Sequence, residues 1–156
     1  RRATPHVGHN GRLGSHVIPA NGVMLGGHVV VGDRGFLGGN CAVHQHVRIG
    51  RLAFLRGGSR ADKDVPPFAM LDDLNIVRGL NRVGLRRAGF SAEAIDGLRR
   101  AFRVLFRARR NLSQAMAEVE SLPLTAEVSE VLDFVRASKR GVSRGPARFE
   151  RAAAGE

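Results

Sequence analysis

The sequence contains few of the residues that disulfides, membrane spans and nucleic-acid binding require. Its single cysteine, Cys41, excludes a disulfide within the chain and suits a reducing compartment, so we expect a cytoplasmic location. No apolar run approaches the roughly 18 residues of a membrane-spanning helix, so we expect no membrane span. Tryptophan and tyrosine are absent, and the 8 phenylalanines are mostly placed for packing. Without an aromatic platform for stacked bases, we expect no nucleic-acid partner.

Acidic residues are scarce relative to basic ones. The 25 Lys and Arg outnumber the 14 Asp and Glu, which gives a formal net charge of +11, and arginine supplies most of the excess. Arg99, Arg103, Arg107 and Arg110 would share one face of a helix. A basic stripe is often only a solvated face. An imbalance of this size nevertheless favours an anionic partner, such as a phosphate-bearing substrate or an acidic carrier protein.

A repeat of six residues runs through the first part of the chain. An apolar residue occupies every sixth position, namely Val7, Leu13, Pro19, Leu25, Val31, Leu37, Val43, Ile49, Leu55 and Ala61. This period fits neither a helix face nor the alternation of a simple strand. It fits a parallel β-helix in which each hexad forms one side of a triangular coil and successive coils stack at roughly 4.8 Å. The apolar residues should point inward, and the glycines that often follow them should relieve strain at the corners.

The repeat should end at Pro66 and Pro67, because two prolines remove donors from a strand ladder. Residues 69–76 should then lead away from the coil. We therefore divide the chain into a β-helix over 1–68, a small helical domain over 69–141 and a disordered basic tail over 142–156. A solenoid normally begins with a capping element, and no residue before Val7 can form one. We expect a β-helix that is truncated at its N-terminus.

Four helices are predicted beyond the repeat. The first is short and basic, over 79–87. Ser91 should cap the second, over 92–109, in which apolar residues recur at helical spacing. Ser113 should cap the third helix, and the fourth should follow Pro123 and end near Gly141.

Three histidines of the repeat are predicted to gather on one side of the coil. His9, His28 and His44 occupy outward or corner positions within about two rungs of each other, or roughly 10 Å. Such positions are often simply solvated. No Asp, Glu or Cys joins the cluster with ligand spacing, so we expect no metal. A neutral imidazole is better suited to be a general base, and the backbone N–H of Gly27 is a candidate donor to an oxyanion.

An ordered series of motifs resembles a known family. The motifs are His6-Val7-Gly8-His9, Leu25-Gly26-Gly27-His28, Ala42-Val43-His44-Gln45, Asp64-Val65-Pro66-Pro67-Phe68 and the stretch from Gly79 to Ser91. Together, over about residues 6 to 138, they resemble the C-terminal part of acyl-[acyl-carrier-protein]–UDP-N-acetylglucosamine O-acyltransferases. The resemblance implies a left-handed parallel β-helix of hexapeptide repeats followed by a helical domain. It also implies a homotrimer with active sites between subunits.

The resemblance implies an acyl transfer that needs no cofactor. A 3-hydroxyacyl chain passes from acyl carrier protein to the 3-hydroxyl of UDP-N-acetylglucosamine, which is the first step of lipid A biosynthesis. By the same resemblance, His9 is the general base and Gly27 the oxyanion donor. The implied substrate-binding residues are His28, His44 and Gln45 for the sugar nucleotide, Asn81 and Arg87 for the nucleotide, and Gly57 for acyl length.

One departure from the family pattern keeps two alternatives open. Asn10 stands where the family usually has an Asp that orients the catalytic histidine. Asn can hold the ring by accepting a bond but supplies no charge, so a slower base is expected. The His-Asn pair is closer to the related N-acyltransferase of the same pathway. The other alternative is a truncated, non-catalytic copy that only assembles or binds acyl carrier protein.

Overall fold

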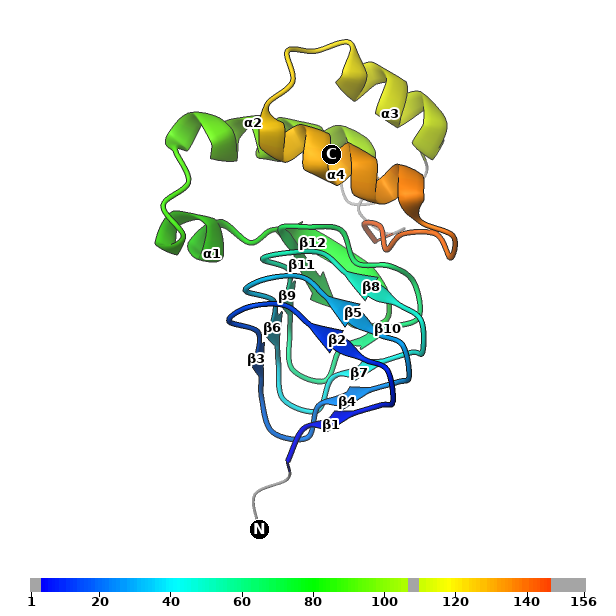
Figure 1. The fold of residues 1–156 in the computed structure, drawn as a ribbon. Helices are drawn as coiled ribbons and strands as arrows, with labels where there is room; N and C mark the ends of the chain where they lie inside the picture. Colours follow the sequence, from blue (N-terminus) through cyan, green and yellow to red (C-terminus); the bar gives the residue numbers. More distant parts are fainter. Residues whose placement is uncertain (1–3, 107–109, 147–156) are drawn as a thin grey trace, which may run out of the picture.

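A computed structural model of the chain describes residues 4–106 and 110–146. The first part is a triangular prism of stacked coils, and the helices cover one end of it (Figure 1). One face carries β1 (His6–Val7), β4 (Met24–Leu25), β7 (Ala42–Val43) and β10 (Arg60–Ala61). The second face carries β2 (Arg12–Leu13), β5 (Val30–Val31) and β8 (Arg48–Ile49). The third carries β3 (Ile18–Pro19), β6 (Phe36–Leu37), β9 (Phe54–Leu55), β11 (Ala69–Asp72) and β12 (Ile76–Leu80).

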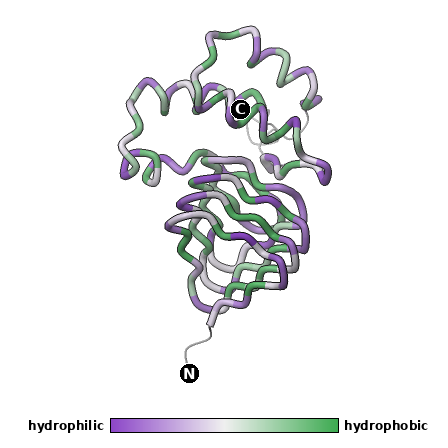
Figure 2. The backbone as a smooth tube through the Cα atoms, in the orientation of Figure 1, coloured by the Kyte–Doolittle hydropathy of each residue, from purple (hydrophilic) through white to green (hydrophobic). Residues whose placement is uncertain are grey.

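The strand register follows the sequence repeat. Val7 pairs with Leu25 and Leu25 with Val43, in parallel, so each step of three hexads advances the chain by one coil. The apolar position of each hexad points into the prism, and Leu25, Leu37 and Leu55 are almost completely buried there. Hydrophobic and hydrophilic stretches alternate along successive coils in Figure 2. The predicted parallel β-helix is confirmed.

The corners of the prism use a left-handed backbone at the fourth position of the hexad. Positive φ angles of 55–66° recur at Asn10, His16, His28, Arg34, Asn40, His46 and Leu52. The glycines at the second position, such as Gly8, have ordinary φ angles, so the expectation that they relieve corner strain is wrong. A Cβ on Gly8 would lie 2.6 Å from the backbone nitrogen of Gly27 in the next coil. Glycine is required there because the coils approach each other closely.

The prism continues past the two prolines, contrary to prediction. Val65 bridges Ile49, and β11 pairs in parallel with β9. Val65 donates its N–H to the carbonyl of Arg48, and Phe68 donates to the carbonyl of Arg51. Pro66 and Pro67 lie between these two donors, so their missing N–H groups leave the ladder intact. The division of the chain into domains at residue 68 stays a prediction, but strand pairing crosses it.

Each helix is preceded by a polar residue whose side chain caps its first turn. The helices are α1 (Arg82–Arg87), α2 (Ala92–Leu105), α3 (Leu112–Glu120) and α4 (Ala126–Ala137). The predicted cap of α2, Ser91, is confirmed, since its side chain accepts from the backbone N–H of Ala94. Helix α3 is capped by Asn111 instead of Ser113. The predicted start of the first helix is wrong, because Gly79 and Leu80 complete β12.

Two arginines of the prism join it to the helices. Arg48 donates to the carbonyl of Phe134 in α4, and its guanidinium lies 4.2 Å from the centre of the Phe134 ring. Arg51 pairs with Glu130, also in α4, at 3.1 Å, and it lies over the ring of Phe68. These contacts fix α4 against the end of the prism.

The segment after α4 returns to the prism. Val142 and Ser143 are buried, and Asp64 forms a parallel bridge with Val142. The predicted disordered tail over 142–156 therefore starts too early, because these residues pack against the last coil. Residues 147–156 lie outside the described part of the chain. The predicted arginine stripe is also changed: α2 ends at Leu105, so Arg110 does not continue its face, and Arg107 is outside the described residues.

Candidate functional site

An open groove of ≈ 890 Å³ lies along the face formed by β1, β4, β7 and β10. It is lined by residues from four successive coils, including His9, Gly27, His44 and Asp62. Because the hexads stack in register, side chains that are distant in sequence form one wall of this groove. Three of the residues predicted from the sequence therefore line one surface.

Histidine rings stack along the corner beside this groove. The rings of His9 and His28 lie 5.1 Å apart in an edge-on arrangement, and those of His28 and His46 lie 4.7 Å apart and nearly parallel. Residues 28 and 46 stand at the same position of successive coils, which explains the stacking. His46 was not among the predicted site residues, although its place in the column of Asn10 and His28 could have revealed it.

Gly27 lies against the ring of His9. A Cβ built on Gly27 would lie 3.2 Å from His9 Nε2, so the two groups are close neighbours. Among residues 4–106 and 110–146, the Gly27 N–H donates to no protein acceptor, whereas the equivalent N–H of Ser15 donates to Asp33 Oδ1 at 2.8 Å. The absence of a side chain on Gly8 leaves space beside the Gly27 nitrogen. The corner thus combines an imidazole with an available backbone donor.

The ring of His44 makes two polar contacts. Its Nδ1 lies 3.1 Å from the carbonyl oxygen of Gln45 and 3.1 Å from Nη2 of Arg140. Arg140 comes from the segment after α4, and nothing in the repeat pointed to it. Gln45 and Asn10 are exposed at the same corners as the histidines.

Three further predicted site residues belong neither to the lining of the groove nor to the histidine corner beside it. Asn81 is buried and caps α1: its Oδ1 accepts from Gly84 N at 3.1 Å, and its Nδ2 donates to the carbonyl of Leu52 at 2.9 Å. Arg87 is exposed in the last turn of α1, and Gly57 is exposed at a corner after β9.

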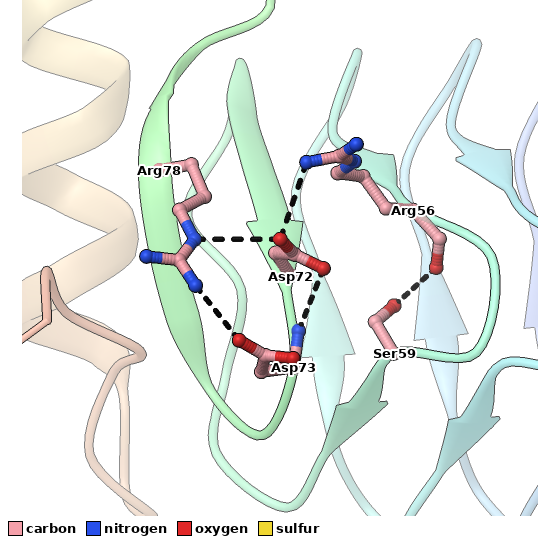
Figure 3. Close-up of polar contacts among 5 residues, drawn as sticks. All are labelled: Arg56, Ser59, Asp72, Asp73 and Arg78. Atoms are coloured by element: carbon pink, nitrogen blue, oxygen red, sulfur yellow. Dashed lines mark hydrogen bonds and ion pairs between the residues drawn. The ribbon is translucent and has the colours of Figure 1, made fainter.

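A polar network fixes the turn over residues 56–59, which contains Gly57 (Figure 3). Arg56 Nη1 pairs with Asp72 Oδ2 at 3.2 Å, and Arg78 bonds both Asp72 and Asp73. Ser59 Oγ donates to the carbonyl of Arg56 at 2.6 Å. The pKa of Asp72 is held below its usual range. The hydrogen bond from the backbone N–H of Asp73 is the largest cause, and the charges of Arg56 and Arg78 add to it. The two carboxylates therefore stabilise the fold at this corner.

The remaining observations concern metal ligands, the single cysteine and the helices. Among the described residues, no three His, Cys, Asp or Glu side chains gather in a way that could hold a metal ion. Burial raises the pKa of the Cys41 thiol to about 11, so the thiol stays protonated at neutral pH. None of the described helices has the length and apolar character needed to cross a membrane.

The hexad coils, the histidine groove and the helical cover define a hexapeptide-repeat β-helix protein. A family model described as UDP N-acetylglucosamine O-acyltransferase, domain 2, matches residues 64–143, which is half of the chain. The chain belongs to the UDP-N-acetylglucosamine O-acyltransferase family.

Relatives and solved structures of this family match most of the chain. An acyl-[acyl-carrier-protein]–UDP-N-acetylglucosamine O-acyltransferase from Anaeromyxobacter sp. is 40% identical over 91% of this chain and 56% of the relative. One from Halorhodospira halophila is 43% identical over 89% of this chain and 55% of the relative. The chain thus spans about half the length of the curated relatives it matches.

The solved structures share the fold. A UDP-N-acetylglucosamine acyltransferase from Bacteroides fragilis superposes with a TM-score of 0.83 at 32% identity, over 87% of this chain and 54% of that one. The enzyme from Francisella novicida gives the same TM-score and identity over 93% of this chain and 54% of that one. The predicted left-handed parallel β-helix with C-terminal helices is confirmed by these matches.

Proposed function

We propose that the protein transfers a 3-hydroxyacyl chain from acyl carrier protein to the 3-hydroxyl of UDP-N-acetylglucosamine, the first step of lipid A biosynthesis. The names of its relatives support this reaction, and one geometric observation carries it. The imidazole of His9 lies beside Gly27, and the backbone N–H of Gly27 has no acceptor among the described residues. A base and an oxyanion donor side by side are what attack on a thioester requires.

The reaction then needs two proton transfers. His9 accepts the proton of the sugar hydroxyl as its oxygen attacks the thioester carbon, and a C–O bond forms. The negative charge on the carbonyl oxygen is stabilised by the N–H of Gly27. The C–S bond breaks as the carbonyl reforms, and His9 returns the proton to the sulfur of the carrier. Every atom comes from the two substrates, so no cofactor is required.

The remaining predicted residues have roles in binding. We propose that His28, His44 and Gln45 hold the sugar nucleotide, with His28 kept in place by stacking on His46. Asn10 lies beside His9 in the chain, where it can orient the ring. Its left-handed φ of 57° suits an asparagine. The exposed arginines of α1 and α2 suit an acidic carrier protein.

We propose a homotrimer as the working assembly. Gly57, Asn81 and Arg87 lie outside the groove formed by one chain, which supports an active site shared between subunits. In such an assembly Gly57 would limit acyl length, and Asn81 and Arg87 would contact the nucleotide. The outward stack of Phe36 and Phe54, with ring centres 4.6 Å apart, provides an apolar strip on the third face.

We also propose a cytoplasmic location, which the single buried Cys41 supports.

The test is acyl transfer by the chain, by His9→Ala and by His16→Ala. His16 is a matched control, because it is an exposed corner histidine outside the groove. We expect His9→Ala to lose transfer by about 10²-fold or more while keeping its assembly, and His16→Ala to retain activity. Full activity in His9→Ala would contradict the assignment of the base.

The acceptor separates this reaction from N-acyl transfer. Asn10 favours the N-acyltransferase as a second candidate, since the His-Asn pair resembles that enzyme. Offering 3-hydroxy and 3-amino sugar nucleotides side by side decides between them. Binding of acyl carrier protein without turnover of either acceptor would instead support a non-catalytic copy.

A further inference from the structure

The segment after α4 is attached to the last coil by backbone and side-chain hydrogen bonds. Asp64 donates its N–H to the carbonyl of Gly141, and Ser143 donates its N–H to the carbonyl of Asp64. Ser138 Oγ donates to Asp64 Oδ2 at 2.8 Å. The carboxyl group of Asp64 is almost completely buried. These bonds hold residue 140 at the edge of the groove.

The guanidinium of Arg140 is fixed at two points. Its Nε donates to the carbonyl of Asp62 at 3.0 Å, and its Nη2 lies 3.1 Å from Nδ1 of His44. Asp62 and His44 both line the groove. Two anchors on a planar group restrict its orientation, so the contact with His44 has a defined geometry.

Arginine is always protonated and can only donate. A hydrogen bond from Arg140 therefore requires Nδ1 of His44 to accept, and in that arrangement the ring proton of the neutral imidazole is on Nε2. The carbonyl of Gln45 lies equally close to Nδ1, at 3.1 Å, and can only accept. It would favour a proton on Nδ1. The two neighbours thus prefer opposite tautomers, and one nitrogen cannot satisfy both.

We propose that Arg140 is a positioning residue that holds His44 in the Nε2–H tautomer. The groove then receives an N–H donor, which suits an oxygen acceptor of the sugar nucleotide. Without Arg140, Nδ1 takes the proton and donates to Gln45, and Nε2 becomes an acceptor. The same ring would then repel the oxygen it should bind. The part of this proposal that concerns the substrate rests on the proposed function, whereas the tautomer does not.

The first experiment reads the tautomer directly in the ligand-free protein. Nitrogen-15 NMR of the His44 ring distinguishes a protonated Nδ1 from a protonated Nε2. We expect the Nε2–H form in the unmodified chain, the Nδ1–H form in Arg140→Met, and no change in Lys139→Met. Lys139 is the matched control, because it is an exposed basic residue that directly precedes Arg140 in the chain. An Nδ1–H ring in the unmodified chain, or no change in Arg140→Met, would overturn the proposal.

The second experiment asks whether Arg140 acts through His44. We expect Arg140→Met to raise KM for UDP-N-acetylglucosamine by about tenfold with a much smaller change in kcat. In a His44→Ala background the same substitution should have almost no further effect. An equal penalty in both backgrounds would mean that Arg140 contacts the substrate itself, and the positioning role would be wrong. If the chain transfers no acyl group, the NMR result alone decides whether Arg140 sets the tautomer of His44. Failure of the proposed function can therefore be distinguished from failure of this proposal.

Discussion

The two ends of the prism are built from the same hexad but differ in how well it is buried. At the end that carries β1, the inward Val7 and Leu13 are 39% and 41% exposed. At the end covered by the helices, Ile49 and Leu55 are 1% and 0% exposed. The repeat fixes the direction of each side chain, but only a neighbouring coil or helix removes it from water. Stability in such a fold depends on interfaces between neighbours.

The proposed site spans both ends of this gradient. His9 belongs to the first coil, where the inward residues are most exposed. His44 lies two coils further along, beside a segment that Asp64 and Arg140 attach to the prism. The proposed general base and the proposed binding residue therefore belong to coils that are buried to different degrees. Each substitution below changes one end and has a matched partner at the other end or outside the site.

The largest effect is expected from Asp64→Ala. Both Asp64 and Asp33 accept a backbone N–H at 2.8 Å, from Arg48 and Ser15 respectively. Asp64 is buried and also bonds Ser138, so its loss leaves buried donors unpaired and should cost about 3–5 kcal/mol in the free energy of unfolding. Asp33 is exposed, and Asp33→Ala should cost about 1 kcal/mol, because water replaces the carboxylate.

Urea unfolding at one protein concentration measures both variants. Similar costs for Asp64→Ala and Asp33→Ala would mean that the two ends are equally supported, and the comparison would fail.

Leucine truncation tests the same gradient in the core. Leu55→Ala should cost about 3 kcal/mol, since the side chain is fully buried and leaves a cavity. Leu13→Ala should cost less than about 1.5 kcal/mol, because much of its side chain is already in water. Thermal and urea unfolding give both values. An equal loss would indicate that another surface covers the first coil in solution.

Gly8→Ala should damage the first coil and the site together. The added Cβ would meet the Gly27 nitrogen at 2.6 Å, so the two coils must move apart and the Gly27 amide must shift. We expect a stability cost of about 2 kcal/mol and at least a tenfold loss of transfer.

Gly39→Ala is the control for this substitution, since its Cβ finds its nearest contact at an ordinary 3.5 Å. Unchanged activity in Gly8→Ala would show that the Gly27 amide is not needed as an oxyanion donor.

The prism was predictable because its information is local and repeated. A period of six places residues 18 apart in one column, and this arithmetic correctly brings His28 close to His9. The same column contains His46, so the stack was available from the sequence although only the other histidines were singled out. The reason why glycine often follows the apolar residue of a hexad was not predictable, because it depends on how closely successive coils approach each other.

The parts outside the repeat could not be placed from the sequence alone. Pro66 and Pro67 were expected to end the coil, and their effect depends on which N–H groups the ladder uses. Arg140 lies 96 residues from His44, in a stretch without an apolar period. It reaches the groove because α4 docks on Arg48 and Arg51 and the segment after α4 bonds to Asp64. Contacts of this kind follow from tertiary packing.

The smallest effect concerns acid stability at the helix-covered end. The pKa of Asp72 is lowered by the Asp73 N–H and then by Arg56 and Arg78 (Figure 3). A carboxyl whose pKa is lower in the folded state stabilises the fold above its ordinary pKa of about 4. This contribution is lost as the pH falls through the folded pKa.

Asp72→Asn should therefore lower Tm slightly at neutral pH and flatten its decline below pH about 4. Tm measured across this range checks the slope, and Asp33→Asn controls for the general loss of a carboxylate. Parallel acid limbs in Asp72→Asn and the unmodified chain would rule out this contribution. If the prediction holds, acid weakens β11 more than the first coil. The two ends of the prism should then differ less in their protection from hydrogen exchange at low pH than at neutral pH.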